Sequence, residues 1–358
     1  MSEIARIIII IYIMNCGLFA DDIKILNNPI PNYWEKELSK LDLVKTIENR
    51  IDQKTYLFRP QSIAIDNQNN IFIFDSIQGK LIKLDSKYEV KAVIGKKGRG
   101  NNEFGAINDI MNINIKIGKN GDVIVQDGIN KQFQIFSNDL TFKRVQLYPR
   151  SRTIFNWLPS NKNGDIYPIS IDNNILNIID DKGAIYQTIE LSGENSTYLF
   201  IAPSSLMLDV TKEDVQLEWG IENELIAYFP FSSCLDIIRK DVFKKFHIFP
   251  KKAIDNYRNR IKELRNKLDF VKVGQQLIID NDNRERLYIQ FNEHINDKAI
   301  VKLYQFNKNG ELGDIYTIEY VSIDDYIKKI VAKRNNLFYA LWQDKITIYK
   351  KPEVDRRN

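Results

Sequence analysis

Short apolar runs separated by polar turns follow one another from Phe58 to Phe104, and this rhythm constrains the fold more than any other feature. Each run alternates, or nearly alternates, apolar and polar residues, which is the period of β-strands with one buried face. Four such strands followed by a fresh start are typical of one blade of a β-propeller. The expected strands are Ser62–Asp66, Ile71–Asp75, Lys80–Asp85 and Glu89–Ile94.

The same unit recurs along the rest of the chain, as an apolar strand, a turn rich in Asn, Asp and Gly, and further apolar strands. The last unit supplies three strands, so its fourth place is open for Leu43–Glu48, which would pair with Lys345–Tyr349 and remove an open sheet edge. We therefore predict an all-β fold, a six-bladed β-propeller of four-stranded antiparallel blades, over residues 21–352. A polar tail follows at 353–358.

Two alternatives to this assignment remain open. The segment before the first blade has apolar residues at helical spacing, so a short helix competes there with the closing strand. A decorated β-sandwich competes with the propeller for the whole fold. The residues at helical spacing are Trp34, Leu38, Leu41 and Val44.

The first twenty residues, 1–20, have the pattern of an export signal. Arg6 precedes the apolar run Ile7–Met14, which is too short for a stable bilayer-spanning helix of ~20 residues. Cys16 stands where a lipoprotein signal places its lipidated cysteine, and cleavage after Ala20 is the alternative. We expect an exported protein, periplasmic or anchored to a membrane through Cys16. A buried first strand is the competing interpretation of the apolar run.

The composition of the chain restricts the kinds of partner that we expect and the role of its cysteines. The formal net charge is +4 over 358 residues, and basic residues form no stripe interleaved with aromatics, so we expect no nucleic-acid binding. Only Cys234 remains in the folded body, which rules out an internal disulfide. Its apolar surroundings in the sequence favour a buried structural cysteine over a nucleophile.

The first blade resembles the NHL-repeat branch of six-bladed β-propellers. In that family an Asp-containing turn precedes an Asn-led strand that ends in Asp, and a Gly-rich link ending in Phe joins consecutive blades. The Pro that often follows this Phe is missing here. The resemblance covers Ile63–Asp85 and Ile94–Asp109, with weaker echoes at Asp127, Asn130 and Phe136, and the matching residues are Asp66, Asn70, Asp75, Gly95, Gly98, Gly100 and Phe104. We expect Asp66 and Asp75 to hold turns.

A helical insertion is expected at 251–270, after Pro250. Its apolar residues recur at three- and four-residue steps, and its opposite face is basic. Such a helix packs on the propeller rim or docks on a partner or an anionic membrane.

The sequence supports a catalytic function less well than a binding function. Some NHL-like propellers are metal-dependent lyases or lactonase-like hydrolases, so the alternative function is such an enzyme with a carboxylate and histidine site at the central channel. The chain holds two histidines, His247 and His294, fewer than a three-histidine zinc site needs. We expect no cofactor, although a calcium or other divalent site made of carboxylates and carbonyls stays open. The oligomeric state is unknown.

The sequence therefore favours a non-catalytic binding or scaffolding propeller, which recognises a protein or small ligand through loops at one end of the ring. Polar residues that lead into the first strand of each blade are the candidates. They are Arg59, Gln61, Asn108, Asp109, Arg152, Asn156 and Gln275.

Overall fold

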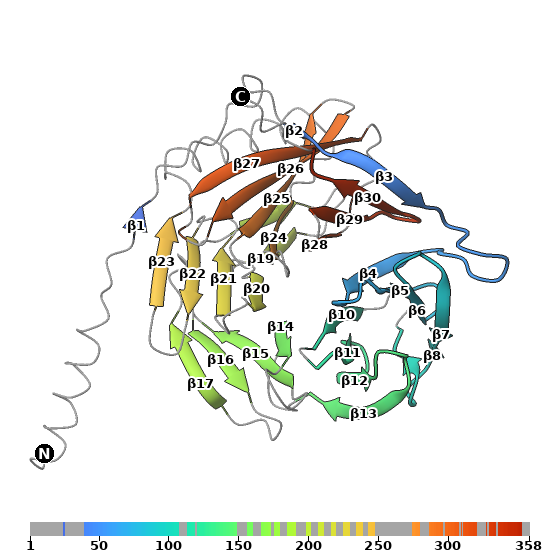
Figure 1. Ribbon diagram of the computed structural model, residues 1–358. Coiled ribbons are helices and arrows are strands. Elements are labelled where there is room, and N and C mark those ends of the chain that lie inside the picture. The colour runs from blue at the N-terminus through green and yellow to red at the C-terminus, as the bar shows by residue number, and fades with distance from the viewer. Residues whose placement is uncertain are drawn as a thin grey trace, which may run out of the picture. The chain divides into compact units, whose positions relative to one another are not determined.

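The computed structural model is built from β-strands (Figure 1). It describes residues 24–25, 39–106, 113–118, 120–148 and 336–352, and, between residues 156 and 333, strands β14 to β28 with residues 309, 311 and 327. The expected helix at 251–270, the export signal at 1–20 and the polar tail lie outside the described residues. Among the residues described we find no helix of the length and hydrophobicity that a bilayer crossing requires.

The chain divides into two units, which we describe one at a time. The larger unit comprises residues 37–190, 271–308 and 312–358. Its first two sheets are four-stranded antiparallel meanders, as the alternation of apolar residues predicts. They are β4 (Pro60–Ile65), β5 (Ile71–Asp75), β6 (Lys80–Leu84) and β7 (Val90–Ile94), then β10 (Ile113–Ile117), β11 (Val123–Asp127), β12 (Gln132–Phe136) and β13 (Phe142–Leu147).

Three more sheets of four or five strands belong to this unit within the described residues. Two of them gain a strand from near the start of the chain, because β2 (Ser39–Lys40) lies parallel to β27 and β3 (Asp42–Ile47) lies antiparallel to β30. The remaining strands are β14 (Asn156–Pro159), β15 (Ile166–Asp172), β16 (Ile175–Ile179), β17 (Ile185–Glu190), β24 (Gly274–Ile279), β25 (Arg286–Ile295), β26 (Lys298–Asn307), β27 (Leu312–Tyr320), β28 (Lys329–Lys333), β29 (Leu337–Leu341) and β30 (Ile346–Lys350).

The smaller unit comprises residues 1–36, 191–270 and 309–311. It contains a sheet in the order β1-β23-β22-β21-β20 and the hairpin β18-β19. These strands are β1 (Lys24–Ile25), β18 (Tyr198–Ile201), β19 (Met207–Val210), β20 (Gln216–Trp219), β21 (Leu225–Phe229), β22 (Cys234–Ile238) and β23 (Phe243–His247).

The pairing of β3 with β30 confirms the predicted closing strand of the last sheet (Figure 1). Leu43 lies opposite Tyr349, and Ile47 lies opposite Ile346. A register shift between Leu43 and Lys45 leaves Val44 exposed. The helix considered for this segment is therefore wrong over residues 39–47, because tertiary pairing with β30 outweighs a weak helical spacing.

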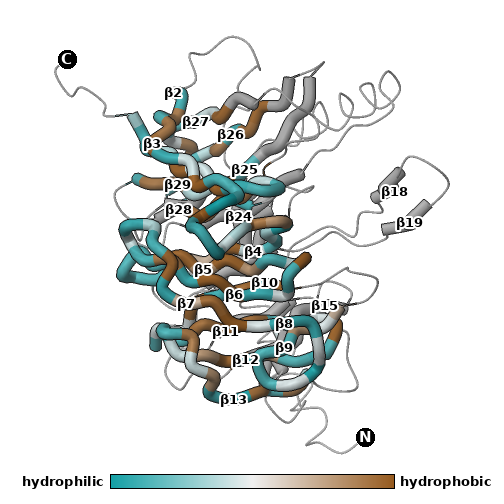
Figure 2. The backbone as a smooth tube through the Cα atoms, turned by 90° about the vertical axis from the view of Figure 1, so that its right-hand side faces the viewer, coloured by the Kyte–Doolittle hydropathy of each residue, from teal (hydrophilic) through white to brown (hydrophobic). Residues whose placement is uncertain are grey.

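Neighbouring sheets of the larger unit pack face against face, so an inner strand such as β5 is buried on both sides. In β5, Ile71 and Ile73 belong to a core shared with β29 and β30, whereas Phe72 and Phe74 belong to a core shared with β10 and β11. The whole of β5 is buried, which corrects the expectation of one buried face per strand. Figure 2 shows hydrophobic residues along β5 and β11. Each buried Phe or Ile contributes about 1.5–3 kcal/mol.

The Gly-rich link between the first two sheets ends in Phe104, which is fully buried. Its ring meets the Phe74 ring edge-on at 4.9 Å between centroids, so the link is fastened to the first sheet. The neighbouring backbone bends at Gly95, where φ is +100°. A side chain there would lie 2.6 Å from the Gly79 carbonyl oxygen and 2.7 Å from the Phe104 ring, so only glycine fits. Two short parallel strands, β8 (Lys96–Lys97) and β9 (Glu103–Phe104), hold the loop together.

Candidate functional site

The segment that leads into β4 is held against the β5–β6 turn by Asp75, which has no exposed surface. Asp75 Oδ2 accepts hydrogen bonds from the backbone N–H groups of Phe58, at 2.6 Å, and Arg59, at 3.0 Å. Its Oδ1 accepts one from the N–H of Gln78 at 3.0 Å. Ser76 N–H in turn donates to the Arg59 carbonyl at 3.0 Å. One carboxylate therefore fixes two loops at the same end of the first sheet.

The second sheet repeats this arrangement with Asp127, which is also fully buried. Asp127 Oδ2 accepts a hydrogen bond from Gly105 N–H at 2.9 Å, and its Oδ1 accepts one from Asn130 N–H at 3.0 Å. The Asn130 side chain donates onward to the Gly98 carbonyl at 2.8 Å. Both sheets therefore present a pinned loop pair at corresponding positions, and we call this end of the two sheets the loop face.

The turn between β4 and β5 at the other end of the first sheet is held by Asp66. Its Oδ1 accepts hydrogen bonds from the N–H groups of Gln68 and Asn70, both at 2.8 Å. These bonds and those of Asp75 confirm that both aspartates hold turns, as short carboxylate side chains do.

Two of the predicted binding residues lie on the loop face. Arg59 is exposed just before β4, and Gln61 is half-buried at a register shift between Pro60 and Ser62. A bulge of this kind reorients a side chain at the end of a strand. Neither residue is shown to bind a ligand, so their role stays a prediction.

Of the other predicted binding residues, two are located only by their strand register and three lie outside the described residues. Asn156 begins β14 opposite Ile169, and Gln275 lies in β24 opposite Phe291. Asn108, Asp109 and Arg152 lie outside the described residues, as does the lipidation candidate Cys16. We therefore draw no common site from this set.

Sequence reasoning missed two residues of the loop face, Phe58 and Ile77. They are 55% and 47% exposed, unusually high for large apolar side chains beside a packed core. The signal in the sequence was an apolar residue inside each of two polar connections, which strand counting does not reveal.

The charged groups near the loop face are arranged around backbone donors. Glu103 Oε2 accepts hydrogen bonds from the N–H groups of Gly100, at 2.9 Å, and Arg99, at 3.0 Å. Lys96 Nζ lies 3.0 Å from Glu103 Oε1. The Gly100 N–H, followed by Lys96 and the Arg99 N–H, lowers the pKa of the Glu103 carboxyl group below its usual value. Ionised Glu103 therefore holds the Arg99–Gly100 loop by accepting hydrogen bonds from its backbone N–H groups.

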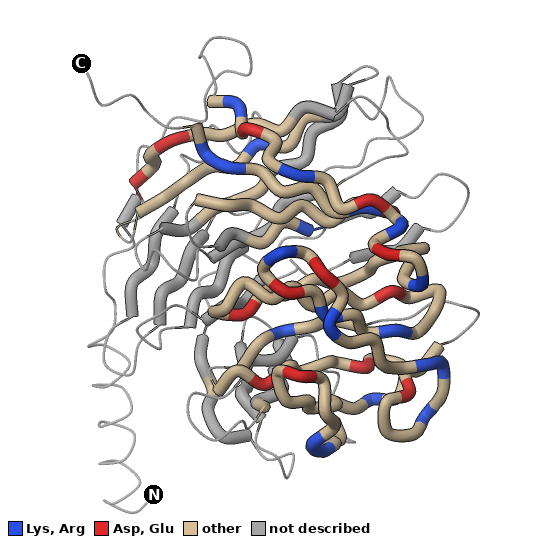
Figure 3. Tube along the Cα trace, turned by 45° about the vertical axis from the view of Figure 1, so that its right-hand side comes forward, with Lys and Arg blue, Asp and Glu red and all other residues tan. Residues whose placement is uncertain are grey.

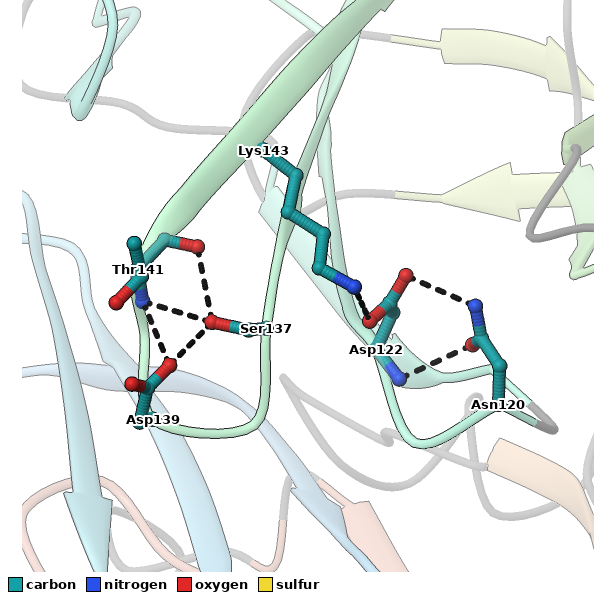
Figure 4. A network of polar contacts seen from close by, with 6 residues as sticks. All are labelled: Asn120, Asp122, Ser137, Asp139, Thr141 and Lys143. Atoms are coloured by element: carbon teal, nitrogen blue, oxygen red, sulfur yellow. Dashed lines mark hydrogen bonds and ion pairs between the residues drawn. The ribbon is translucent and has the colours of Figure 1, made fainter.

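At the opposite end of the second sheet, two polar clusters hold the β10–β11 and β12–β13 turns (Figure 4). Asp122 accepts hydrogen bonds from the Asn120 side chain at 2.9 Å and from Lys143. Asp139 accepts one from the Ser137 hydroxyl group, which lowers the pKa of Asp139. Each carboxylate is engaged by its own turn, so these clusters serve the fold.

The two histidines are placed by their strands. His247 ends β23, the fourth strand of its meander, opposite Cys234, while His294 lies in β25 beside the β25–β26 turn, opposite Ala299. In the part of the chain that the structure describes, we find no group of three or more His, Cys, Asp or Glu side chains arranged to hold a metal ion.

No family model matches the sequence, and no curated protein matches it. Among solved structures, the chain is similar to a member of the DUF4221 family from Bacteroides vulgatus, with a TM-score of 0.50, 9% identity, and coverage of 88% of this chain and 99% of that one. Virginiamycin B lyase from Staphylococcus aureus gives a TM-score of 0.47 at 11% identity, covering 87% and 99%. The Pan2 WD40 domain of Neurospora crassa gives 0.45 at 9% identity, covering 89% and 98%.

These structural neighbours are β-propeller proteins. At such low identity the likeness concerns the fold alone. The four-stranded antiparallel sheets and this likeness together support a propeller-like, repetitive all-β architecture.

Proposed function

We propose that the chain is a six-bladed β-propeller of the NHL-repeat kind, with β3 as the closing strand of its last blade. We further propose that it is a non-catalytic binding or scaffolding protein that recognises a protein or small ligand through its loop face. This extends the resemblance of the first blade to the whole chain. The supporting evidence is the repeated four-stranded meander and the strand that β3 adds to the last one.

The observation that carries the binding role is the use made of the buried carboxylates at the loop face. Asp75 and Asp127 are engaged by backbone N–H groups of the loops that they pin. Such pinning orders the loops before any ligand arrives, which lowers the entropic cost of binding. Arg59 and Gln61 are then presented on a rigid support, as recognition residues usually are.

The proposed location follows from the sequence. Residues 1–20 would direct export, and Cys16 would either carry a lipid anchor or be removed by cleavage after Ala20. Mass spectrometry of the protein from its producing cell distinguishes these outcomes. A lipid-modified cysteine at the N-terminus indicates a tethered protein, and an N-terminus at Asp21 indicates a soluble exported one.

The binding role is tested by a photo-reactive amino acid placed at Arg59 or at Gln61 in the producing cell. We expect both positions to cross-link to one partner. Lys87, which is exposed in the β6–β7 turn at the end of the first sheet opposite the loop face, provides the control position. Equal cross-linking from Lys87, or none from Arg59 and Gln61, would contradict recognition through the loop face.

The enzyme alternative predicts a different result. Metal analysis of the purified protein would find a stoichiometric divalent ion, and a structure would show it held by residues from several sheets. That outcome would replace the binding role with a hydrolase or lyase. Docking through the predicted 251–270 helix is a third hypothesis, and loss of partner binding on deletion of that helix would support it.

A further inference from the structure

Phe58 and Ile77 lie on the loop face, in the two connections that Asp75 fixes to each other. Ser76 N–H donates to the Arg59 carbonyl at 3.0 Å, and Gln78 Nε2 donates to the Tyr56 carbonyl at 2.7 Å. These two hydrogen bonds flank Phe58 in one connection and Ile77 in the other. Both side chains are exposed, so the two connections together present apolar surface.

An aromatic ring and a cation extend this surface. The Tyr56 ring lies 6.1 Å from the Phe58 ring between centroids, and the Arg50 guanidinium group lies 5.7 Å from the centre of the Tyr56 ring. Gln78 Nε2 donates a hydrogen bond to the Tyr56 carbonyl at 2.7 Å, which ties this segment to the β5–β6 turn. We call Tyr56, Phe58 and Ile77 the apolar patch.

The second sheet shows that the turn itself does not require an exposed Phe. Gly105 occupies the position of Phe58, because its N–H donates to Asp127 as that of Phe58 donates to Asp75. A Cβ on Gly105 would lie 2.8 Å from Ile129 Cβ, so Ile129 covers the glycine closely. The same turn thus forms with a glycine and a covered position. The exposure of Phe58 is a property of its side chain, not a requirement of the fold.

Cations surround the apolar patch. Arg50 and Arg59 flank it on the β4 side, and the backbone of Lys96 and Lys97 lies against Gly79, two residues beyond Ile77. The acids Asp52 and Glu103 keep their charges, because backbone N–H groups of Lys54, at 2.7 Å, and of Arg99, at 3.0 Å, stabilise the ionised carboxylates. Basic residues nevertheless outnumber acidic ones in these connections. Figure 3 shows Lys and Arg in blue and Asp and Glu in red along the described chain. The excess of positive charge around the patch attracts an acidic partner.

We propose that the apolar patch receives a large apolar side chain from a partner polypeptide segment in which acidic residues flank that side chain. The inference rests on the proposed binding function and names its partner class. The apolar side chain would pack between Phe58 and Ile77, where exclusion of water gives most of the affinity, and the flanking carboxylates would face Arg59 and Arg50. Arg59 was predicted as a binding residue from the sequence, and Phe58 supplies the apolar contact beside it.

The test is a selection from a phage-displayed library of random twelve-residue peptides on the purified chain without residues 1–20. We expect the selected peptides to carry Trp, Phe or Leu beside Asp or Glu. Synthetic copies should bind Phe58→Ala and Ile77→Ser about tenfold more weakly than the unchanged protein, since truncated aromatic contacts are the costly ones. Arg59→Glu should weaken binding about fivefold, and rising salt should weaken wild-type binding. Val44→Ser, at an exposed apolar position of β3, is the matched control and should bind normally.

The outcomes separate this inference from the function on which it rests. Peptides that bind equally well to Phe58→Ala, or that are basic, would overturn the inference and leave a binding role at another surface. Failure to select any peptide would also overturn it, as would binding to vesicles of anionic phosphatidylglycerol that depends on Phe58. Thermal unfolding of each variant checks the fold, and Phe58→Ala should melt as the wild type does because the second sheet has glycine at that position.

Discussion

Asn138 and Asp66, which belong to different sheets, are joined by a hydrogen bond of 2.6 Å from Asn138 Nδ2 to Asp66 Oδ2. Asp66 holds the β4–β5 turn of the first sheet, and Asn138 lies in the β12–β13 turn of the second. Lys83 Nζ, also from the first sheet, donates to Asn138 Oδ1 at 2.7 Å. One side chain thus links the turn capping of two neighbouring sheets.

Replacing this link should weaken the contact between the two sheets. We expect Asn138→Ala to lower the free energy of unfolding by about 1–2 kcal/mol, because a partly buried Asp66 oxygen and the Lys83 ammonium group each lose a partner. Urea unfolding followed by tryptophan fluorescence measures the change. Lys87→Ala, an exposed residue of the β6–β7 turn, is the control and should change stability by less than about 0.5 kcal/mol. Equal stability of the two variants would show that the link carries no energy.

The buried caps should be much more sensitive than exposed ones. We expect Asp75→Asn to cost about 2–3 kcal/mol, because the amide loses the charge that strengthens three hydrogen bonds and turns an N–H₂ group toward backbone donors. Asp139→Asn, at an exposed turn where water can replace the lost bonds, should destabilise the protein much less than Asp75→Asn does. Chemical denaturation compares the two. If the Asp75→Asn variant were as stable as the wild type, Asp75 would not be needed to hold the two loops of the loop face together.

Two residues of the closing strand β3, one buried and one exposed, test how much this strand stabilises the last sheet. Ile47 is 5% exposed and packs with the core around Ile346 and Ile348, whereas Val44 on the same strand is 54% exposed. We expect Ile47→Ala to destabilise the protein by about 2–4 kcal/mol and Val44→Ala by less than about 0.5 kcal/mol. Thermal unfolding of both variants measures the two changes in stability. Similar small effects would mean that β3 contributes little to holding the last sheet.

Acid should weaken the β6–β7 turn. The side-chain hydrogen bond from Lys91, followed by the N–H of Glu89, lowers the pKa of Asp85 from 3.8 to about 2. Because this pKa is depressed in the folded state, the stability that Asp85 contributes is present above about pH 4 and is lost as the pH falls from about 4 toward 2. A carbon-detected NMR titration of the Asp85 carboxyl group measures its pKa.

Two variants check the cause of this shift. Lys91→Ala should move the Asp85 pKa upward toward 3.8, since the first cause of the shift is removed. The difference in urea midpoint between the wild type and Asp85→Asn should shrink as the pH is lowered toward about 2. A wild-type Asp85 that titrates at 3.8 would contradict the proposed hydrogen bonding.

Much of the first sheet could be predicted from local pattern. The strand Ile71–Asp75 has the predicted bounds, and β6 and β7 differ from prediction by one residue. The caps at Asp66 and Asp75 could be predicted because a short carboxylate beside a turn finds backbone N–H groups within a few residues. The pairing of β3 with β30 was predictable because the last sheet otherwise lacks its fourth strand.

The candidate site could be predicted only in part, because some of its features depend on contacts between segments that are far apart along the chain. Arg59 and Gln61 precede an identifiable strand, so their place at its beginning follows from the sequence. The approach of the Phe58 and Ile77 connections depends on how β4 pairs with β5, and the exposure of both side chains depends on what packs above them. Nothing local distinguishes an apolar residue that a neighbouring loop covers, such as Ile129, from one that remains exposed.

The sequence by itself determined the strands, the turns between them and the carboxylates that cap those turns, because these depend on interactions between near neighbours. Only the tertiary structure decided that both faces of β5 are buried, that Asn138 joins Asp66 across two sheets, and that Phe58 and Ile77 stay exposed on the loop face. Those features arise where separate strands and sheets come together, and the alternation of residues within one strand carries no information about its neighbours.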